Sequence, residues 1–406
     1  MTLITIILII ALTFGLTDFL TERFPRLQRE IYYIAWFTVA FLFTIKYYYG
    51  ADILNYVKFY RDIQNPHDVL AHPDKIPMHF EIGYALFCSI LKSLGVSFYW
   101  HTAIVSVIYF VVIAKLFARI ERNRSLALAI LVVLDYNCIF ATYRQCLAVS
   151  CFILMVLCLQ DKKYFFAVLM AVLTVSFHKS GAFVIAIVLF YEMVHNKWVK
   201  PYLYQAMLVV LAIVFFMPIA RFSSAVIAHL PLPESYLVSL THHLLLGRQL
   251  QLVFLVYAVT LLVVIHFTQY YTNRITSIAT AAVMGLLLTV LMYQHYYLLG
   301  RIRSYFLPLV IVFVFNMVQD AEDEHVRVPY GTLLKQLGCV VLFMYMVHST
   351  YVFEKNARLQ KNKIYTTCTV FTLIDHRASD VQKAQIKQAR QWWNEDFMKG
   401  VGNKVN

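Results

Sequence analysis

The sequence predicts an all-α, polytopic integral membrane protein. Apolar residues make up 61% of the chain and charged residues only 14%, and the mean hydropathy is +0.66. Soluble domains carry roughly 25% charged and 45–50% apolar residues, so this chain has too little polar surface to face water on all sides. Its apolar residues also gather into runs of near-membrane length that short polar segments separate.

The chain is basic as well as apolar, with 35 Lys and Arg against 22 Asp and Glu and a net charge of +13. Membrane proteins concentrate Lys and Arg in short cytoplasmic loops, and most basic residues here lie between apolar runs. We therefore expect the lipid bilayer as the surroundings and no nucleic-acid partner. The seven cysteines form no C-x-x-C pair, so neither a disulfide framework nor a zinc knuckle is expected.

A helix that crosses the hydrocarbon needs roughly 20 apolar residues, with a range of about 17–25. About twelve or thirteen candidate runs follow one another without a dividing linker. We expect one multi-pass membrane domain over residues 1–350 and a polar C-terminal tail over 351–406. The candidate runs cover 3–19, 31–48, 82–95, 102–118, 125–142, 145–160, 164–178, 181–194, 203–219, 251–268, 277–293, 304–318 and 333–350.

The basic connections set the orientation. The segments expected on the cytoplasmic side are 21–30, 118–125, 160–164, 195–200 and 272–274. The opposite side then receives 49–81, 142–145, 178–181, 220–250 and 293–303, of which 49–81 and 220–250 are the large external loops. The run 82–95 is short and contains Lys92. The loop assignment is consistent only if this run penetrates the membrane partly or lies on its surface.

Ionisable side chains gather at the expected outer ends of the spans. Such groups are costly near hydrocarbon, so each needs a partner or a task. Arg144 lies between two apolar runs on the side where positive charge is not expected. Arginine offers a planar fork of donors that suits phosphate and pyrophosphate oxygens. The candidates at these outer ends are Asp52, Glu81, Arg144, His178, Lys179, Arg301 and Arg303.

Each of these residues also has a simpler explanation. The arginines can extend toward lipid headgroups, and the carboxylates can pair with them for structure alone. His178 can be an interfacial histidine with satisfied hydrogen bonds. His242 and His243 lie side by side without a spaced third ligand, so we expect no metal and no cofactor.

The order of the motifs favours a shared site over scattered anchors. "YYYGAD" carries Asp52 among tyrosines, "HFEIGYALF" carries Glu81, "RQCLA" opens a span with Arg144, "FHKSG" ends one with His178, and "GRIRSYF" follows. This succession, over roughly residues 30–315, resembles the EpsG family of Wzy-like polysaccharide polymerases, with "RQCLA" and "FHKSG" as its most specific parts.

The resemblance implies an enzyme of exopolysaccharide, capsule or O-antigen assembly with a fold like the GT-C class of membrane glycosyltransferases. Similar proteins join undecaprenyl-pyrophosphate-linked oligosaccharide repeat units on the outer face of the bacterial cytoplasmic (inner) membrane. Chain-length regulators and flippases of the same pathway are candidate partners. In the GT-C class an acidic residue of an early external loop is the usual candidate base. This chain has a lone Asp52 and no D-x-D pair, which makes a metal site doubtful.

The residue types fit this chemistry. A carboxylate can take the proton of an acceptor hydroxyl, and Asp52 and Glu81 are the two candidates, with Asp52 slightly preferred. His178 is a further candidate catalytic residue. Tyr48, Tyr49 and Tyr56 offer flat faces and hydroxyls to sugar rings. Cations already in place can stabilise a pyrophosphate leaving group without a metal, and the candidates are Arg144, Lys179, Arg301 and Arg303.

Other functions stay open at this point. A lipid-linked oligosaccharide transporter or flippase needs charge along a central cavity and broken helices. In this sequence the polar residues gather at one face and the middles of the spans look apolar, which favours surface chemistry over transport. An O-antigen ligase or a GT-C transferase of single sugars uses the same reaction class, and the sequence separates these poorly from a polymerase.

Overall fold

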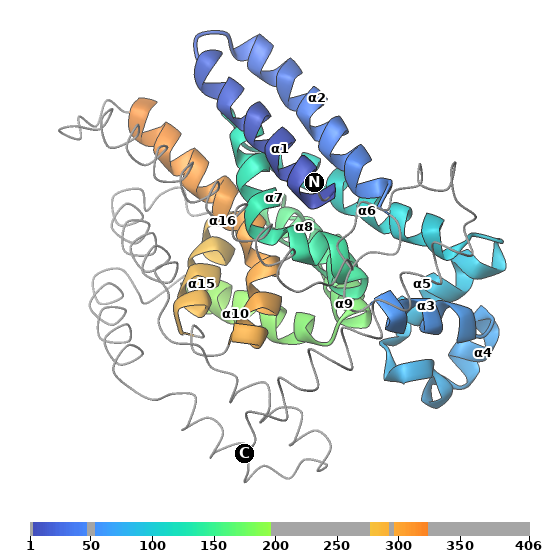
Figure 1. Ribbon diagram of the computed structural model, residues 1–406. Helices are drawn as coiled ribbons and strands as arrows, with labels where there is room; N and C mark the ends of the chain where they lie inside the picture. Colours follow the sequence, from blue (N-terminus) through green and yellow to red (C-terminus); the bar gives the residue numbers. More distant parts are fainter. Residues whose placement is uncertain (1–2, 47–52, 196–276, 292–295, 324–406) are drawn as a thin grey trace, which may run out of the picture. The chain divides into compact units, whose positions relative to one another are not determined.

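The computed structural model describes residues 3–46, 53–195, 277–291 and 296–323 (Figure 1). All regular elements in these ranges are helices, in agreement with the predicted all-α class. The candidate spans at 203–219, 251–268 and 333–350, the external loop 220–250 and the tail 351–406 lie outside the described residues.

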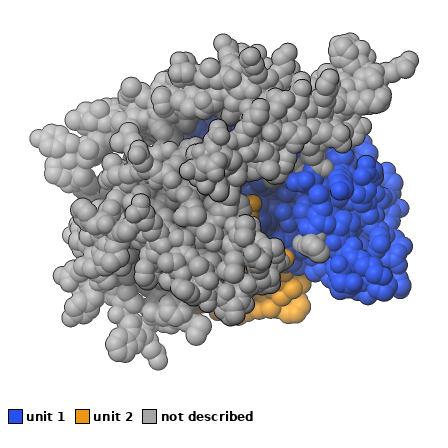
Figure 2. Space-filling view, turned by 60° about the horizontal axis from the view of Figure 1, so that its bottom comes forward, with its two compact units in different colours: residues 1–150, 176–178, 318–406 blue, residues 151–175, 179–317 orange. Residues whose placement is uncertain are grey.

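Two compact units divide the chain (Figure 2). Unit 1 contains residues 1–150, 176–178 and 318–406, and unit 2 contains residues 151–175 and 179–317. Unit 1 holds α1 (Leu3–Leu20), α2 (Pro25–Thr44), α3 (Ile53–Asp62), α4 (Pro66–Ala71), α5 (Ile82–Ser93), α6 (Phe98–Phe117), α7 (Arg124–Ala141) and the first part of α8 (Tyr143–Gln160). Short 3₁₀ turns lie at Pro73–Lys75 and Pro77–His79.

The core of unit 1 forms where α1 packs against α2 and α7, and α2 packs against α6 and α7. Large side chains such as Phe43, Phe110 and Phe140 are fully buried there, and Phe43 contacts both of the others. α7 begins at a left-handed Asn123 whose side chain does not cap the helix. The Asp18 carboxylate of α1 instead accepts the backbone N–H of Leu126 at 2.8 Å, which satisfies one of the open donors of this helix start.

Unit 2 holds most of α9 (Tyr164–Phe177), α10 (Ser180–His195), α15 (Ser277–Leu291) and the greater part of α16 (Tyr296–Asp323), with the last part of α8. α10 packs against α15. A Cβ at Gly285 of α15 would collide with the Phe306 side chain, so α15 and α16 approach closely at this glycine. The Phe152 ring makes edge contacts with Tyr305 and Phe306 and completes this core.

Several helix bounds differ from the predicted runs. α2 begins at Pro25, inside the segment 21–30 that we expected to be a loop, because a proline at the first helical position needs no hydrogen-bond partner. The expected external loop 49–81 contains α3 and α4. The expected outer turn 293–303 is wrong in its last part, because α16 runs continuously from Tyr296. Apolar residues recur at helical spacing around Arg301 and Arg303, and this periodicity continues the helix through the polar stretch.

Among the described helices, α6 and α8 are long and apolar enough to cross a membrane. α1, α5, α9 and α10 contain shorter apolar stretches. α5 has 12 residues, which is about 18 Å of helix and less than the roughly 30 Å thickness of the hydrocarbon. The described part of the chain is therefore consistent with the predicted class of helical membrane protein.

Candidate functional site in unit 1 and a cationic cluster in unit 2

Glu81 and Arg144, predicted separately from two motifs, form an ion pair. Glu81 is the N-cap residue of α5, and its carboxylate makes no hydrogen bond to that helix. Its Oε2 instead accepts a hydrogen bond from Arg144 Nη1 at 2.6 Å. Only 8% of the Glu81 side chain and 23% of the Arg144 side chain are exposed. The pair thus joins the beginnings of α5 and α8, and neither residue is a simple lipid anchor.

Aromatic side chains surround this ion pair. The Arg144 guanidinium lies 3.8 Å from the centre of the Phe80 ring, a close cation–π contact. The Tyr56 hydroxyl is a second hydrogen-bond partner of the guanidinium. The Tyr143 ring meets Tyr56 edge to face at 4.9 Å. We name these five residues, Tyr56, Phe80, Glu81, Tyr143 and Arg144, the Arg144 cluster.

The guanidinium retains unused hydrogen-bonding capacity. Within the described part of the chain, Arg144 Nε is buried and has no hydrogen-bond partner. An arginine presents five N–H donors in a fixed fork. Glu81 therefore fixes one edge of the fork while another donor remains for a bound group. An anion with several oxygens, such as a phosphate, is the ligand that this arrangement suits best.

His101 of α6 lies behind the Arg144 cluster and was not singled out from the sequence. It is fully buried, and its ring contacts five others: Tyr60, Tyr84, Phe87, Phe98 and Tyr143. His101 Nε2 lies 3.4 Å from the Tyr84 hydroxyl. These ring contacts pack α3 and α5 against α6 and α8, and through Tyr143 they support the Arg144 cluster. A histidine in "FYWHTAI" resembles any buried residue of an apolar span, and the sequence offers no signal for its position.

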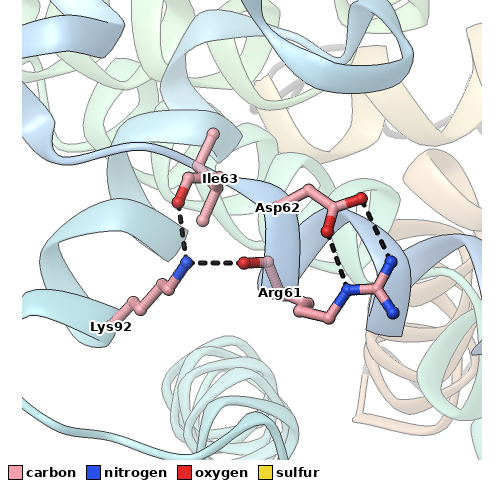
Figure 3. Close-up of polar contacts among 4 residues, drawn as sticks. All are labelled: Arg61, Asp62, Ile63 and Lys92. Carbon is pink, nitrogen blue, oxygen red and sulfur yellow. Dashed lines mark hydrogen bonds and ion pairs between the residues drawn. The ribbon is translucent and has the colours of Figure 1, made fainter.

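Lys92 ties the segment 53–64, which carries Tyr56, to α5 (Figure 3). Lys92 Nζ donates hydrogen bonds to the carbonyls of Arg61 at 2.7 Å and Ile63 at 2.8 Å, where α3 ends. The Ser89 hydroxyl also donates to the carbonyl of Gln64. These carbonyls have no partner within α3, so the lysine acts as a C-terminal cap from another helix. The charge of Lys92, which argued against 82–95 as a full span, thus holds the segment 53–64 in place.

Two ionisable groups of this segment have shifted pKa values. The exposed Arg61 side chain donates to the Asp62 carboxylate and lowers its pKa. Burial raises the pKa of Tyr60 to about 12, since the neutral phenol is favoured away from water. The Tyr60 hydroxyl donates to the carbonyl of Val96 at 2.7 Å and joins α3 to the start of α6.

In unit 2 the motifs "FHKSG" and "GRIRSYF" meet. The Ser180 hydroxyl lies 3.2 Å from the Tyr305 hydroxyl, which places the start of α10 against the first third of α16. Lys179 and Arg301 are exposed and Arg303 is half-buried. We use the name cationic cluster for the residues at or near these two helix starts: Lys179, Ser180, Arg301, Arg303 and Tyr305. Three of the four predicted pyrophosphate ligands therefore belong to unit 2 and the fourth, Arg144, to unit 1.

The remaining predicted residues are placed less completely. His178 is half-buried in the turn between α9 and α10 and belongs to unit 1. Asp52, Tyr48 and Tyr49 lie outside the described residues, so their roles stay predictions. In the described ranges, no group of three or more His, Cys, Asp or Glu side chains could hold a metal ion.

Comparison with known proteins identifies the family. The profile of the EpsG family matches residues 30–370 of the chain. Neither the curated proteins nor the solved structures contain a match. The family suggests a polysaccharide polymerase type of role, which a glycosyltransferase-like enzyme would carry out, in agreement with the resemblance predicted from the motifs. Because the match covers well over half of the 406 residues, the chain belongs to the EpsG family.

Proposed function

We propose that the chain is a membrane glycosyltransferase that polymerises undecaprenyl-pyrophosphate-linked oligosaccharide repeat units on the outer face of the bacterial cytoplasmic membrane. The observation that carries this proposal is the Arg144 cluster. It combines a fixed guanidinium that has a free donor with aromatic rings, at the start of an apolar helix. The guanidinium suits a pyrophosphate, and aromatic rings suit a sugar ring.

The reaction follows from these groups. A sugar hydroxyl of the incoming unit attacks the anomeric carbon of the growing chain, and the bond from that carbon to the pyrophosphate oxygen breaks. The hydroxyl proton passes to a carboxylate base, and the pyrophosphate leaves on its lipid with increased negative charge. Arg144, with Lys179, Arg301 and Arg303 as further candidates, stabilises that charge.

The ion pair with Arg144 supports different tasks for the two candidate bases. One oxygen of the Glu81 carboxylate accepts a short charge-assisted hydrogen bond from Arg144, which stabilises the ionised carboxylate beside the guanidinium. We assign Glu81 the task of holding Arg144 and leave the base to Asp52. Tyr56 contacts both Arg144 and Tyr143, but only 4% of its surface is exposed, so we assign it the task of holding the guanidinium and not that of touching a sugar. Tyr48 and Tyr49 remain candidates from the sequence.

One observation favours the alternative of a lipid-linked oligosaccharide transporter. α7 departs from helical geometry at Asp135, with φ −131° and ψ 20°, and this aspartate is 2% exposed. The expectation that the middles of the spans are plain is wrong here. A broken helix with a buried acid is typical of transport proteins. A kinked helix also fits a protein whose helices do not move during its function, so the experiment has to distinguish a transporter from a polymerase.

The test is the size of the surface glycan in cells that lack the protein and are complemented with variants at matched membrane levels. Wild type should restore long polymer. Arg144→Ala and Asp52→Asn should leave single repeat units on the outer face, and Glu81→Gln should shorten the polymer. Arg122→Ala, an exposed arginine between α6 and α7, is the matched control and should behave as wild type.

Two outcomes would overturn the proposal. Full-length polymer from all three site variants would make these groups structural. Repeat units that fail to reach the outer face in cells without the protein would favour the transporter.

A further inference from the structure

Lys46 is a buried cation that the proposed reaction does not use. Only 1% of its surface is exposed, although lysine is almost never fully buried without a partner. It follows α2, and its Nζ donates a hydrogen bond of 2.5 Å to the carbonyl of Ile139. The described part of the chain gives this ammonium no carboxylate within ion-pair distance. Its other contacts are the faces of Phe140 and Tyr143, at 5.4 and 5.0 Å from the ring centres.

These contacts all lie in the turn that leads to Arg144. Ile139 belongs to the last turn of α7, where carbonyls lack partners within the helix. The neighbouring carbonyl of Cys138 is already taken by the backbone and hydroxyl of Thr142. A cation at this end also meets the negative end of the α7 dipole. Lys46 therefore satisfies the open C-terminus of α7 directly before α8 begins.

The contact with Tyr143 extends this support to the Arg144 cluster. Tyr143 is the first residue of α8, and its ring contacts Tyr56, Phe98 and His101. Arg144 follows it in the chain. A displacement of the Tyr143 ring would move the backbone from which the guanidinium reaches Glu81 and Phe80.

We infer that Lys46 is a positioning residue that fixes the α7–α8 turn and thereby the direction of the Arg144 guanidinium. The inference rests on the proposed function for its catalytic meaning, since it assigns Lys46 a task in binding the pyrophosphate of the substrate. Lys46 does not itself touch the substrate. Its effect on catalysis passes through Arg144.

The first experiment measures the geometry of the cluster without any reaction. The apparent melting temperatures of Glu81→Gln, Arg144→Gln and the double variant give the coupling between the two side chains in purified protein. The same cycle is then made on Lys46→Met, which keeps the length and apolar bulk of the side chain. Lys115→Met is the matched control, because Lys115 is an exposed lysine near the end of α6.

If Lys46 positions Arg144, the coupling between Glu81 and Arg144 falls by more than about half in Lys46→Met and is unchanged in Lys115→Met. A general loss of stability that leaves the coupling intact would overturn the inference, because a merely structural lysine would lower every melting temperature by a similar amount. Lys46→Arg keeps the charge and should retain more of the coupling than Lys46→Met.

The second experiment connects the turn to function and separates the two proposals. Glycan length is compared for Lys46→Met, Arg144→Lys and the double variant at matched membrane levels, because Arg144→Lys keeps the charge and should leave a shortened polymer in which further shortening can be seen. A residue that acts through the Arg144 guanidinium gives little further shortening in the Arg144→Lys background, whereas additive shortening contradicts the inference. If wild type produces no polymer at all, the proposed function fails, and the melting cycle still decides the role of Lys46.

Discussion

The Arg144 cluster of unit 1 and the cationic cluster of unit 2 differ in the surroundings of their charged side chains. In unit 1, Arg144 is mostly buried, held by Glu81 at 2.6 Å and covered by the Phe80 ring. In unit 2, Lys179 and Arg301 are exposed at helix starts beside the Ser180–Tyr305 contact. In the Arg144 cluster the guanidinium, its carboxylate partner and the aromatic rings hold one another in place. The cationic cluster carries exposed cations near the starts of α10 and α16.

This difference indicates how the cations of each unit can act. A guanidinium fixed by a carboxylate and an aromatic ring has its direction set before a substrate arrives, which is what electrostatic stabilisation of a leaving group requires. Exposed cations are screened by salt and adapt their position, which suits attraction of an anionic lipid substrate. Substitutions in unit 1 should therefore damage stability and activity together, and those in unit 2 mainly activity.

The largest expected effect is that of Arg144→Ala. It removes the charged partner of the largely buried Glu81 carboxylate, so the free energy of unfolding should fall by about 2–4 kcal/mol, and polymer should be lost. Thermal unfolding of purified protein measures the first effect and glycan size the second. The double variant Glu81→Gln/Arg144→Gln should regain part of the stability but no polymer. Equal stability of the single and double variants would show that the two residues are not coupled.

The cations of unit 2 should show the opposite pattern. Lys179→Ala and Arg301→Ala remove exposed charges, so each should change the free energy of unfolding by less than about 0.5 kcal/mol. Polymer should become shorter, and the difference from wild type should be larger at low salt than at high salt, because salt screens the attraction that the removed cation provides. Thermal unfolding and glycan size at two ionic strengths check this. A loss of stability as large as that of Arg144→Ala would remove the contrast between the units.

Lys92→Met tests the link between α5 and the segment 53–64 of unit 1. The carbonyls of Arg61 and Ile63 lose a charged donor at an exposed position, so the free energy of unfolding should fall by about 1 kcal/mol. Lys58→Met, on the exposed face of α3, is the matched control and should have no such effect. Hydrogen exchange of residues 53–64 should quicken in the first variant alone. Equal exchange in both would show that Lys92 does not hold this segment.

The smallest expected effect is a pH dependence from Tyr60. Its pKa is raised to about 12 in the folded chain, so its contribution to stability is complete below its ordinary pKa of about 10. That contribution falls as the pH rises through 12, and by pH 11 the loss should be at most about 1 kcal/mol. Thermal unfolding from pH 9 to 11 should show a steeper decline for wild type than for Tyr60→Phe. Parallel declines would contradict this.

Much of the fold could be predicted from the sequence because hydrophobic runs of limited length leave few choices in a membrane protein. α1, α6, α7, α8, α9 and α10 agree with predicted runs to within a few residues. The predicted helix bounds are wrong in segments that contain both polar and apolar residues. The segment 53–62 is a helix because its apolar side chains Ile53, Tyr56, Phe59 and Tyr60 recur at helical spacing and are all buried. The charges of Arg301 and Arg303 indicate a turn, whereas α16 already begins at Tyr296.

The sequence predicts several residues of the candidate site but not which of them contact one another. Glu81, Arg144 and Tyr56 were chosen because charged or aromatic groups stood at the ends of apolar runs, and they do come together. That Glu81 pairs with Arg144 depends on how α5 and α8 are placed, which no local pattern contains. Lys46 and His101 were passed over, since each stands inside an apolar stretch and its importance depends on neighbours that are distant in the sequence.

The central claim is that a fixed Arg144 stabilises the pyrophosphate that leaves when repeat units are joined. The most direct measurement is polymerisation by the purified chain in lipid vesicles supplied with lipid-pyrophosphate-linked repeat units. It follows the ladder of products and the released lipid pyrophosphate together. Wild type should give both, and Arg144→Ala should give neither while still incorporating into the vesicles. A ladder of normal length from Arg144→Ala would contradict the account, as would transfer of intact repeat units across the bilayer without a ladder.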